Sequence, residues 1–152
     1  MIGVSFALLD FVENYKMNLQ HTIVMETGGM KGRKKEITRE ELHSILKNGF
    51  GTNEIHSEYG MTELLSQGYS RGDLTFKSPN WMRILIRETE DPFQYVEEGK
   101  TGGVNVIDLA NYNSISFIAT DDLGKKITHN QFEILGRFDH SDVRGCNLMV
   151  IE

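Results

Sequence analysis

The sequence changes its hydrophobic pattern near residue 70, and this change constrains the fold more than any other feature. Upstream of it, helical segments alternate with short apolar runs, whereas downstream of it only short apolar runs and turns follow one another. The upstream pattern predicts helices over residues 5–15 and 38–47 and strands over residues 22–25 and 54–58. Such alternation is typical of an α/β layer built as strand, turn, helix and strand.

The downstream half contains four runs that are rich in apolar and β-branched residues and are separated by turn residues. These features predict strands over residues 81–87, 103–109, 114–119 and 131–135, with turns at residues 98–100, 121–124 and 129–130. The sequence therefore predicts an α/β fold, with an α/β layer over residues 1–70 and a β-rich sheet or barrel over residues 71–152. We place the boundary in the polar segment 68–79 and expect one compact unit.

The second predicted helix has recognisable start and stop signals. Thr38 can cap its N-terminus, and Glu41 three residues later completes a capping box. Leu42 begins an apolar stripe on the helix, and the Asn48–Gly49 pair is expected to end it.

The composition excludes several classes of protein. Sixteen Lys and Arg residues against 22 Asp and Glu residues give a net charge of −6, which argues against a general nucleic-acid binder. The single cysteine, Cys146, rules out an intrachain disulfide framework, and no stretch is apolar enough for a membrane span. Because the first nine residues do not resemble a signal peptide, we expect a cytoplasmic protein.

The segment Tyr59, Gly60, Met61, Thr62 and Glu63 combines an aromatic ring, a flexible glycine, a hydroxyl and a carboxylate within five residues. These groups could respectively stack on a base, let a ligand approach the backbone, bind a phosphate and hold Mg²⁺. The alternative is a turn that leads into a helix, with Thr62 as the N-cap and Glu63 in the first helical turn.

Three further segments could carry chemistry, and each has a structural alternative. Gly28 and Gly29 follow a predicted strand in the α/β half, at the end of such strands where ligands collect. Asp122 lies in the Asp121–Gly124 segment, where a carboxylate could accept from ribose hydroxyls or bind a metal ion. The alternative is an ordinary β-turn. Arg137 lies in a charged segment, residues 136–145, that could contact a nucleotide sugar or form an exposed loop.

Taken in order, these four motifs resemble the adenylate-forming superfamily, whose members activate carboxylic acids with ATP. The resemblance extends from Gly28 to Gly145 and is strongest to the branch that contains the acyl-protein synthetase of bacterial bioluminescence. It implies the use of ATP, with AMP formed on the enzyme, and of Mg²⁺, with a small carboxylic acid, such as a fatty acid, as the substrate.

The resemblance also implies roles for individual residues, grouped by the part of the nucleotide that they would contact. The adenine would lie against Gly28, Gly29 and Met30 and stack on Tyr59, with Gly60 allowing close approach. Thr62 would bond a phosphate, Glu63 would hold Mg²⁺, Asp122 would accept from the ribose hydroxyls, and Arg137 would support the same sugar. Cys146 would carry the acyl group, which requires thiolate character; its alternative is a small buried apolar residue.

Two departures from the superfamily pattern shape the expected activity. No phosphate loop rich in Ser, Thr and Gly precedes Gly28, and no further domain with a catalytic lysine follows Gly145. We therefore expect a C-terminal portion of a longer ligase that binds ATP weakly by itself and does not complete adenylation. Two alternatives follow: a nucleotide-binding or interaction module without activity, and a fragment that self-associates through a surface exposed by truncation.

Overall fold

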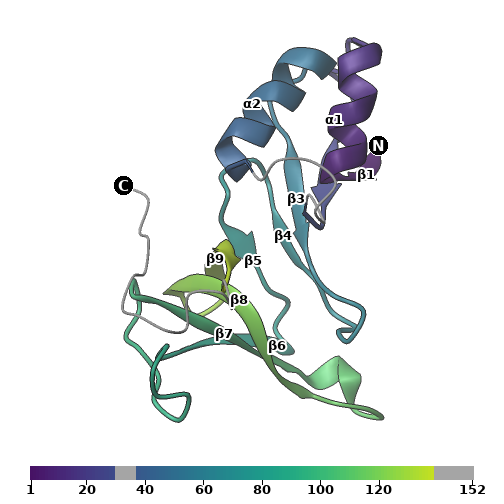
Figure 1. Cartoon of the computed structure of the whole chain (residues 1–152). Coiled ribbons are helices and arrows are strands. Elements are labelled where there is room, and N and C mark those ends of the chain that lie inside the picture. The colour runs from purple at the N-terminus through teal and green to yellow at the C-terminus, as the bar shows by residue number, and fades with distance from the viewer. Residues whose placement is uncertain (30–36, 139–152) are drawn as a thin grey trace.

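The computed structural model describes residues 1–29 and 37–138 (Figure 1). Within these residues the fold contains two α-helices, one short 3₁₀ helix and nine strands. The helical elements are α1 (Ser5–Asn14), α2 (Arg39–Phe50) and η1 (Leu109–Asn111). The strands are β1 (Ile2–Val4), β2 (Met25–Thr27), β3 (His56–Tyr59), β4 (Gly68–Ser70), β5 (Phe76–Lys77), β6 (Met82–Arg87), β7 (Thr101–Asp108), β8 (Phe117–Thr128) and β9 (Gln131–Arg137).

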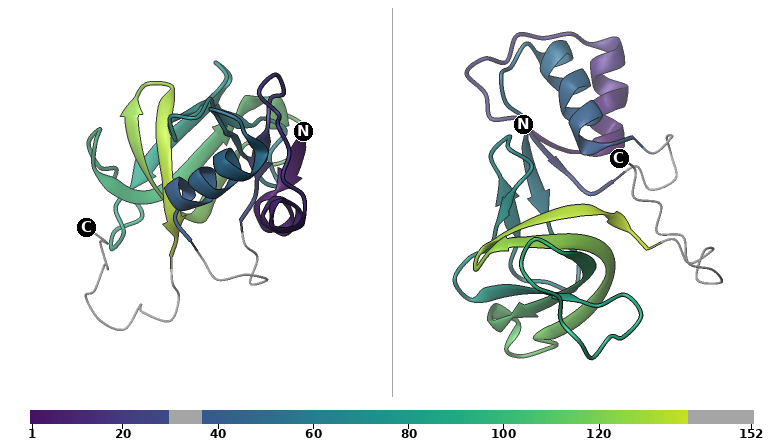
Figure 2. Two further views of the ribbon diagram at one scale, coloured as in Figure 1. Left: turned by 90° about the horizontal axis from the view of Figure 1, so that it is seen from above. Right: turned by 90° about the vertical axis from the view of Figure 1, so that its left-hand side faces the viewer.

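All nine strands form one continuous sheet in the order β1-β2-β3-β4-β5-β9-β8-β7-β6. The first three strands pair in parallel, and every later pair is antiparallel. Helices α1 and α2 lie together beside the parallel end, whereas the long strands β6 to β9 curl into a separate curved half (Figures 1 and 2). The predicted fold class, an α/β layer followed by a β-rich sheet, is confirmed. The division of the chain at residue 70 stays a prediction.

Both predicted helices are present. In α1 the spacing of Leu8, Leu9 and Val12 turns one face of the helix into the core, while Tyr15 already lies beyond the helix end. In α2 the Thr38 hydroxyl accepts from the Glu41 amide at 3.2 Å, as the cap prediction requires. Neither helix of the described part is long and apolar enough to cross a membrane.

The predicted end of α2 at Asn48–Gly49 is wrong, because the helix continues to Phe50. Gly51 forms the C-cap in the left-handed conformation, with φ 56°, and its amide bonds to the Lys47 carbonyl. Tertiary packing explains the extension, since Phe50 is fully buried and Gly49 lies against Val12 of α1. Gly49 is a close-packing position within the helix and not a stop signal.

The strands of the α/β layer also differ from the prediction. The strand expected over residues 22–25 forms over Met25–Thr27, because its register is set on both sides by β1 and β3. The strand expected over 54–58 is β3, His56–Tyr59. The sequence did not reveal β1, β4 or β5, which are only two or three residues long.

The largest correction concerns residues 121–124, which were expected to form a turn. They lie inside β8, a 12-residue strand that pairs with β7 on one side and β9 on the other. The predicted strand over residues 114–119 is therefore the start of a much longer one. Gly124 is needed for close packing, since an added Cβ would lie 2.6 Å from Val104 and 2.7 Å from the Glu133 carbonyl.

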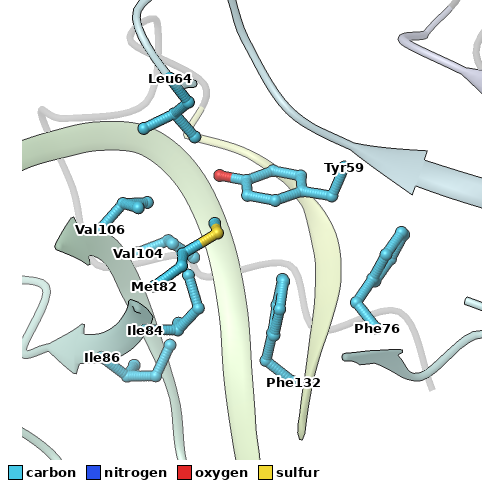
Figure 3. Close-up of a cluster of buried hydrophobic side chains, with 9 residues drawn as sticks. All are labelled: Tyr59, Leu64, Phe76, Met82, Ile84, Ile86, Val104, Val106 and Phe132. Carbon is cyan, nitrogen blue, oxygen red and sulfur yellow. The ribbon is translucent and has the colours of Figure 1, made fainter. Parts of the chain in front are cut away.

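Two hydrophobic clusters stabilise the fold. One lies between the helices and the parallel strands and contains Leu8, Leu9, Val12, Val24, Leu42, Leu46, Phe50 and Ile55. The other fills the curved half and contains Tyr59, Leu64, Phe76, Met82, Ile84, Ile86, Val104, Val106 and Phe132 (Figure 3). The predicted motif residue Tyr59 is thus part of the second core.

Candidate functional site

Three predicted site residues meet where β3, β8 and β9 approach one another. The Tyr59 hydroxyl donates to Asp122 Oδ2 at 2.8 Å across a sequence separation of 63 residues. On the other side, Arg137 Nε lies 3.5 Å from Asp122 Oδ1, and Arg137 Nη2 lies 3.6 Å from Asp121. Asp122 and Arg137 face each other because they are register partners on β8 and β9. We call this group of three residues, Tyr59, Asp122 and Arg137, the Asp122 cluster.

Tyr59 anchors the Asp122 cluster to the core. Its ring packs edge-on against Phe76 and Phe132, with centroids 6.0 and 5.5 Å away, and only 8% of the residue is exposed (Figure 3). Burial, reinforced by the Asp122 carboxylate, raises the pKa of Tyr59 far above its ordinary value. The phenol therefore stays neutral and holds Asp122 in one orientation. Stacking of this ring on adenine stays a prediction.

The glycine turn after β2 lies near Tyr59, at the C-terminal ends of the parallel strands β2 and β3. Thr27 is the register partner of Glu58 on β3, so Gly28 follows beside Tyr59, and the Thr27 hydroxyl bonds to the Glu58 carboxylate at 3.1 Å. Gly28 has φ 68°, and its carbonyl accepts from the Ser5 hydroxyl at 3.2 Å. Within the described residues, a Cβ added at Gly29 would meet no atom within 4 Å, so none of these residues covers the backbone there.

Thr62 and Glu63 lie in an exposed turn, closed by a hydrogen bond from the Leu64 amide to the Met61 carbonyl at 3.1 Å. The alternative prediction, a helix capped by Thr62, is wrong, because the chain continues into β4 and not into a helix. Within the described residues, no hydrogen bond or ion pair joins the Thr62 or Glu63 side chain to the Asp122 cluster. An added Cβ at Gly60 would lie 3.1 Å from Gln67 Cγ, so the turn folds closely back on itself.

Asp108 fixes this turn, and the sequence did not indicate that role. Its buried carboxylate accepts from the Leu65 amide at 2.9 Å, the Ser66 amide at 2.8 Å and the Ser66 hydroxyl at 2.7 Å. It also accepts from the Ala110 amide at 3.1 Å. Burial alone would raise the pKa of Asp108, but these hydrogen bonds outweigh it and lower the pKa below its ordinary value. The sequence feature that could have indicated this role is an Asp at the end of a strand, because an Asp side chain can accept from the backbone amide two residues later.

A second buried polar group, Glu26, is linked to the glycine turn through the Ser5 hydroxyl. Glu26 is only 2% exposed and accepts from the Ser5 hydroxyl at 2.9 Å. Its other oxygen lies 3.3 Å from Arg39 Nε and 3.6 Å from His43 Nε2, and that histidine nitrogen lies 3.0 Å from the Ser57 hydroxyl. Burial would raise the pKa of Glu26, but the bonds from His43 and Ser57 and the charge of Arg39 lower it. A lone acid after a β-branched run was the sequence signal for this cluster.

The structure thus brings together only part of the predicted site. Asp122 contacts both Tyr59 and Arg137, and Gly28 lies beside Tyr59. Thr62 and Glu63 occupy the turn that follows Tyr59 in the chain. Met30 and Cys146 lie outside the described residues. Among the described residues, no group of three or more His, Cys, Asp or Glu side chains could hold a metal ion.

Comparison with known proteins gives a fold and no sequence relative. No protein-family model and no curated protein sequence matches the chain. ATP-bound MatB from Rhodopseudomonas palustris is similar at a TM-score of 0.64 and 15% identity, covering 90% of this chain and 30% of that one. O-succinylbenzoate Coenzyme A synthetase (MenE) from Bacillus subtilis is similar with ATP and magnesium bound, at a TM-score of 0.60, 20% identity and 90% and 31% coverage. Its AMP complex gives a TM-score of 0.59 at 21% identity. This chain therefore spans about a third of the length of these structures and shares their fold over that part.

Proposed function

We propose that the chain is part of an ATP-dependent ligase that activates a carboxylic acid as an acyl-adenylate. The observation that carries this proposal is the Asp122 cluster, in which three of the motif residues meet from three separate strands. The similarity of the fold to ATP-bound MatB, and to MenE with ATP and magnesium or with AMP bound, also supports it. The proposed activity is that of a longer ligase, because the matched structures are about three times as long as this chain.

The Asp122 cluster has the chemistry of a ribose site. An ionised carboxylate offers about four acceptor positions, and Asp122 uses one for the Tyr59 hydroxyl and another faces Arg137. The remaining positions can accept from two neighbouring ribose hydroxyls. Arg137, whose side chain is 73% exposed, can hydrogen-bond the same sugar.

The Gly28–Gly29 turn lies beside Tyr59, and the exposed Thr62–Glu63 turn follows Tyr59 along the chain. We assign adenine to the glycine turn together with Met30, Tyr59 and Gly60, and phosphate to the Thr62 hydroxyl. Glu63 fits a Mg²⁺ ligand, because Mg²⁺ is commonly held by one or two carboxylates together with substrate phosphates. Bound there, Mg²⁺ would neutralise charge on the phosphates.

The finer assignment places the chain in the acyl-protein synthetase branch, with a fatty acid as substrate and Cys146 as acyl carrier. Sequence motifs alone support it. We expect hydroxylamine-sensitive acyl label on the natural protein supplied with fatty acid and ATP, and we expect Cys146→Ser to abolish that label. Label that persists in Cys146→Ser would remove this role from Cys146.

Saturation-transfer NMR with AMP tests the ribose site, because the method detects weak binding. We expect transfer to the ribose protons in the wild type. The loss of charge-assisted bonds in Asp122→Asn should weaken binding by roughly tenfold. Asp91→Asn, which changes a half-buried acid outside the site, serves as the matched control.

Equal AMP binding by Asp122→Asn and Asp91→Asn would refute the ribose assignment. AMP binding in a natural protein that shows no acid-dependent pyrophosphate exchange would instead favour the second candidate, a nucleotide-binding module without catalysis. Absence of AMP binding together with dimer formation in sedimentation would favour the self-associating fragment.

A further inference from the structure

The ribbon formed by β4 and β5 turns one face into the core and the other outward. Gly68 and Phe76 are buried on the inner face, whereas Tyr69 and Lys77, which are register partners, point outward. Arg71, which directly follows β4, is exposed and lines the same groove as Tyr69. The outer face therefore carries an aromatic ring and two cations, and Glu58 of β3 lies beside Tyr69 as its register partner.

An open groove of about 730 Å³ lies along this outer face, within the usual range for small-molecule sites. We call it the β4–β5 groove. Its apolar end is lined by Leu65, Pro79 and Trp81, of which Leu65 is 65% and Trp81 55% exposed. The Trp81 ring is held in place, because its indole N–H donates to the Ser66 hydroxyl at 2.9 Å. A fixed, exposed aromatic ring at the end of a groove is suited to an apolar ligand.

The antiparallel register separates this apolar end from a cationic end. Tyr69 pairs with Lys77 in this antiparallel register. Pro79 therefore lies near the residues that precede β4, whereas Thr75 lies near Arg71, which follows β4. Arg71 and Lys77 both line the groove, and within the described residues neither forms an ion pair. The one acid of the groove, Asp73, is engaged by the Ser70 hydroxyl and the Thr75 amide, each at 3.2 Å.

We propose that the β4–β5 groove binds an amphipathic organic anion, with its anionic group between Arg71 and Lys77 and its apolar body against Tyr69 and Trp81. Two unpaired cations on a chain of net charge −6 favour an anion locally against the overall field. The exposed apolar surface beside them favours a ligand with a hydrocarbon body over a simple ion. None of the groove residues belongs to the Asp122 cluster, so this site does not depend on the proposed nucleotide site.

Tryptophan fluorescence tests the proposal directly, because Trp81 is the only tryptophan of the chain. The full chain, without nucleotide, is titrated with decanoate. Decanol is the uncharged control with the same hydrocarbon chain, and acetate is the control anion that lacks a long hydrocarbon chain. We expect saturable change in Trp81 emission with decanoate and a Kd at least roughly tenfold weaker for decanol and acetate. A parallel titration with 4-phenylbutyrate distinguishes an aliphatic from an aromatic body.

The double variant Arg71→Gln/Lys77→Gln should weaken decanoate binding by roughly tenfold or more, since both charge-assisted contacts are lost. Lys16→Gln/Lys100→Gln removes the same charge from exposed positions outside the groove and should bind decanoate as the wild type does. Equal binding by the two double variants, or equal binding of decanol and decanoate, would overturn the proposal.

Discussion

Replacement of Asp108 tests how the Thr62–Glu63 turn is held. Four donors converge on its carboxylate, and two of them, the Ser66 amide and the Ser66 hydroxyl, are buried. The Leu65 and Ala110 amides are partly exposed and can bond water after the replacement. Each buried donor left without a partner costs about 1–3 kcal/mol, so Asp108→Ala should lower the free energy of unfolding by about 2–6 kcal/mol.

Urea unfolding followed by far-UV circular dichroism and by Trp81 fluorescence measures this loss. The indole of Trp81 bonds to Ser66, so its emission also reports whether the turn loosens before the fold unfolds. Asp91→Ala is the matched control, because Asp91 accepts from the Phe93 amide and from Gln94 at exposed positions. If the two variants shift the urea midpoint equally, the anchoring role of Asp108 is wrong.

The dependence on pH gives a second test of the same anchor. Because the folded pKa of Asp108 lies below its unfolded value of about 3.9, its stabilising contribution is complete above that value. The contribution is lost as the pH falls through the folded pKa. Asp108→Asn cannot lose this proton-linked term, so its stability should decline less steeply than that of the wild type between about pH 5 and about pH 2. Parallel acid declines would contradict the argument.

Two further substitutions test the helices and the glycine turn. Glu26→Gln leaves Arg39 and His43 facing a neutral amide and should lower the free energy of unfolding, measured in urea, by about 3–5 kcal/mol. The control Glu40→Gln changes an exposed residue and should alter this free energy little. Equal effects of the two substitutions would refute the stabilising role of the buried Glu26 cluster. Gly51→Ala places a side chain in the left-handed C-cap conformation, so it should lower the free energy of unfolding by about 1–2 kcal/mol and lower the melting temperature. Gly51→Asn should lower both less, because Asn tolerates this conformation. An unchanged melting temperature in Gly51→Ala would contradict the cap.

The helices show how far local sequence signals extend. The Thr38 cap depends on one hydroxyl three residues from the amide that it accepts from, so sequence spacing alone predicts it. The end of α2 depends on Phe50 packing in the core and on Gly49 fitting against Val12 of another helix, which no local window contains. The predicted stop at Asn48–Gly49 therefore failed for a tertiary reason.

The strand β8 shows the same limit at the candidate site. Asp121, Asp122 and Gly124 have the composition of a turn, but pairing with β7 and β9 on both sides keeps them extended, with a register shift at Leu123 and Gly124. Gly124 is required by the nearby Val104 side chain and Glu133 backbone, and not by a turn conformation.

The order of the motifs determined which residues to consider together, and the alternation of helices and strands determined the fold class. Those features are encoded locally, in spacing and in side-chain chemistry. Only the tertiary structure decided that Tyr59 bonds to Asp122, that Arg137 faces Asp122 from the neighbouring strand, and that Asp108 holds the Thr62–Glu63 turn. These contacts join residues that are 15 to 63 positions apart. Their geometry follows from strand register, which a one-residue shift would change completely.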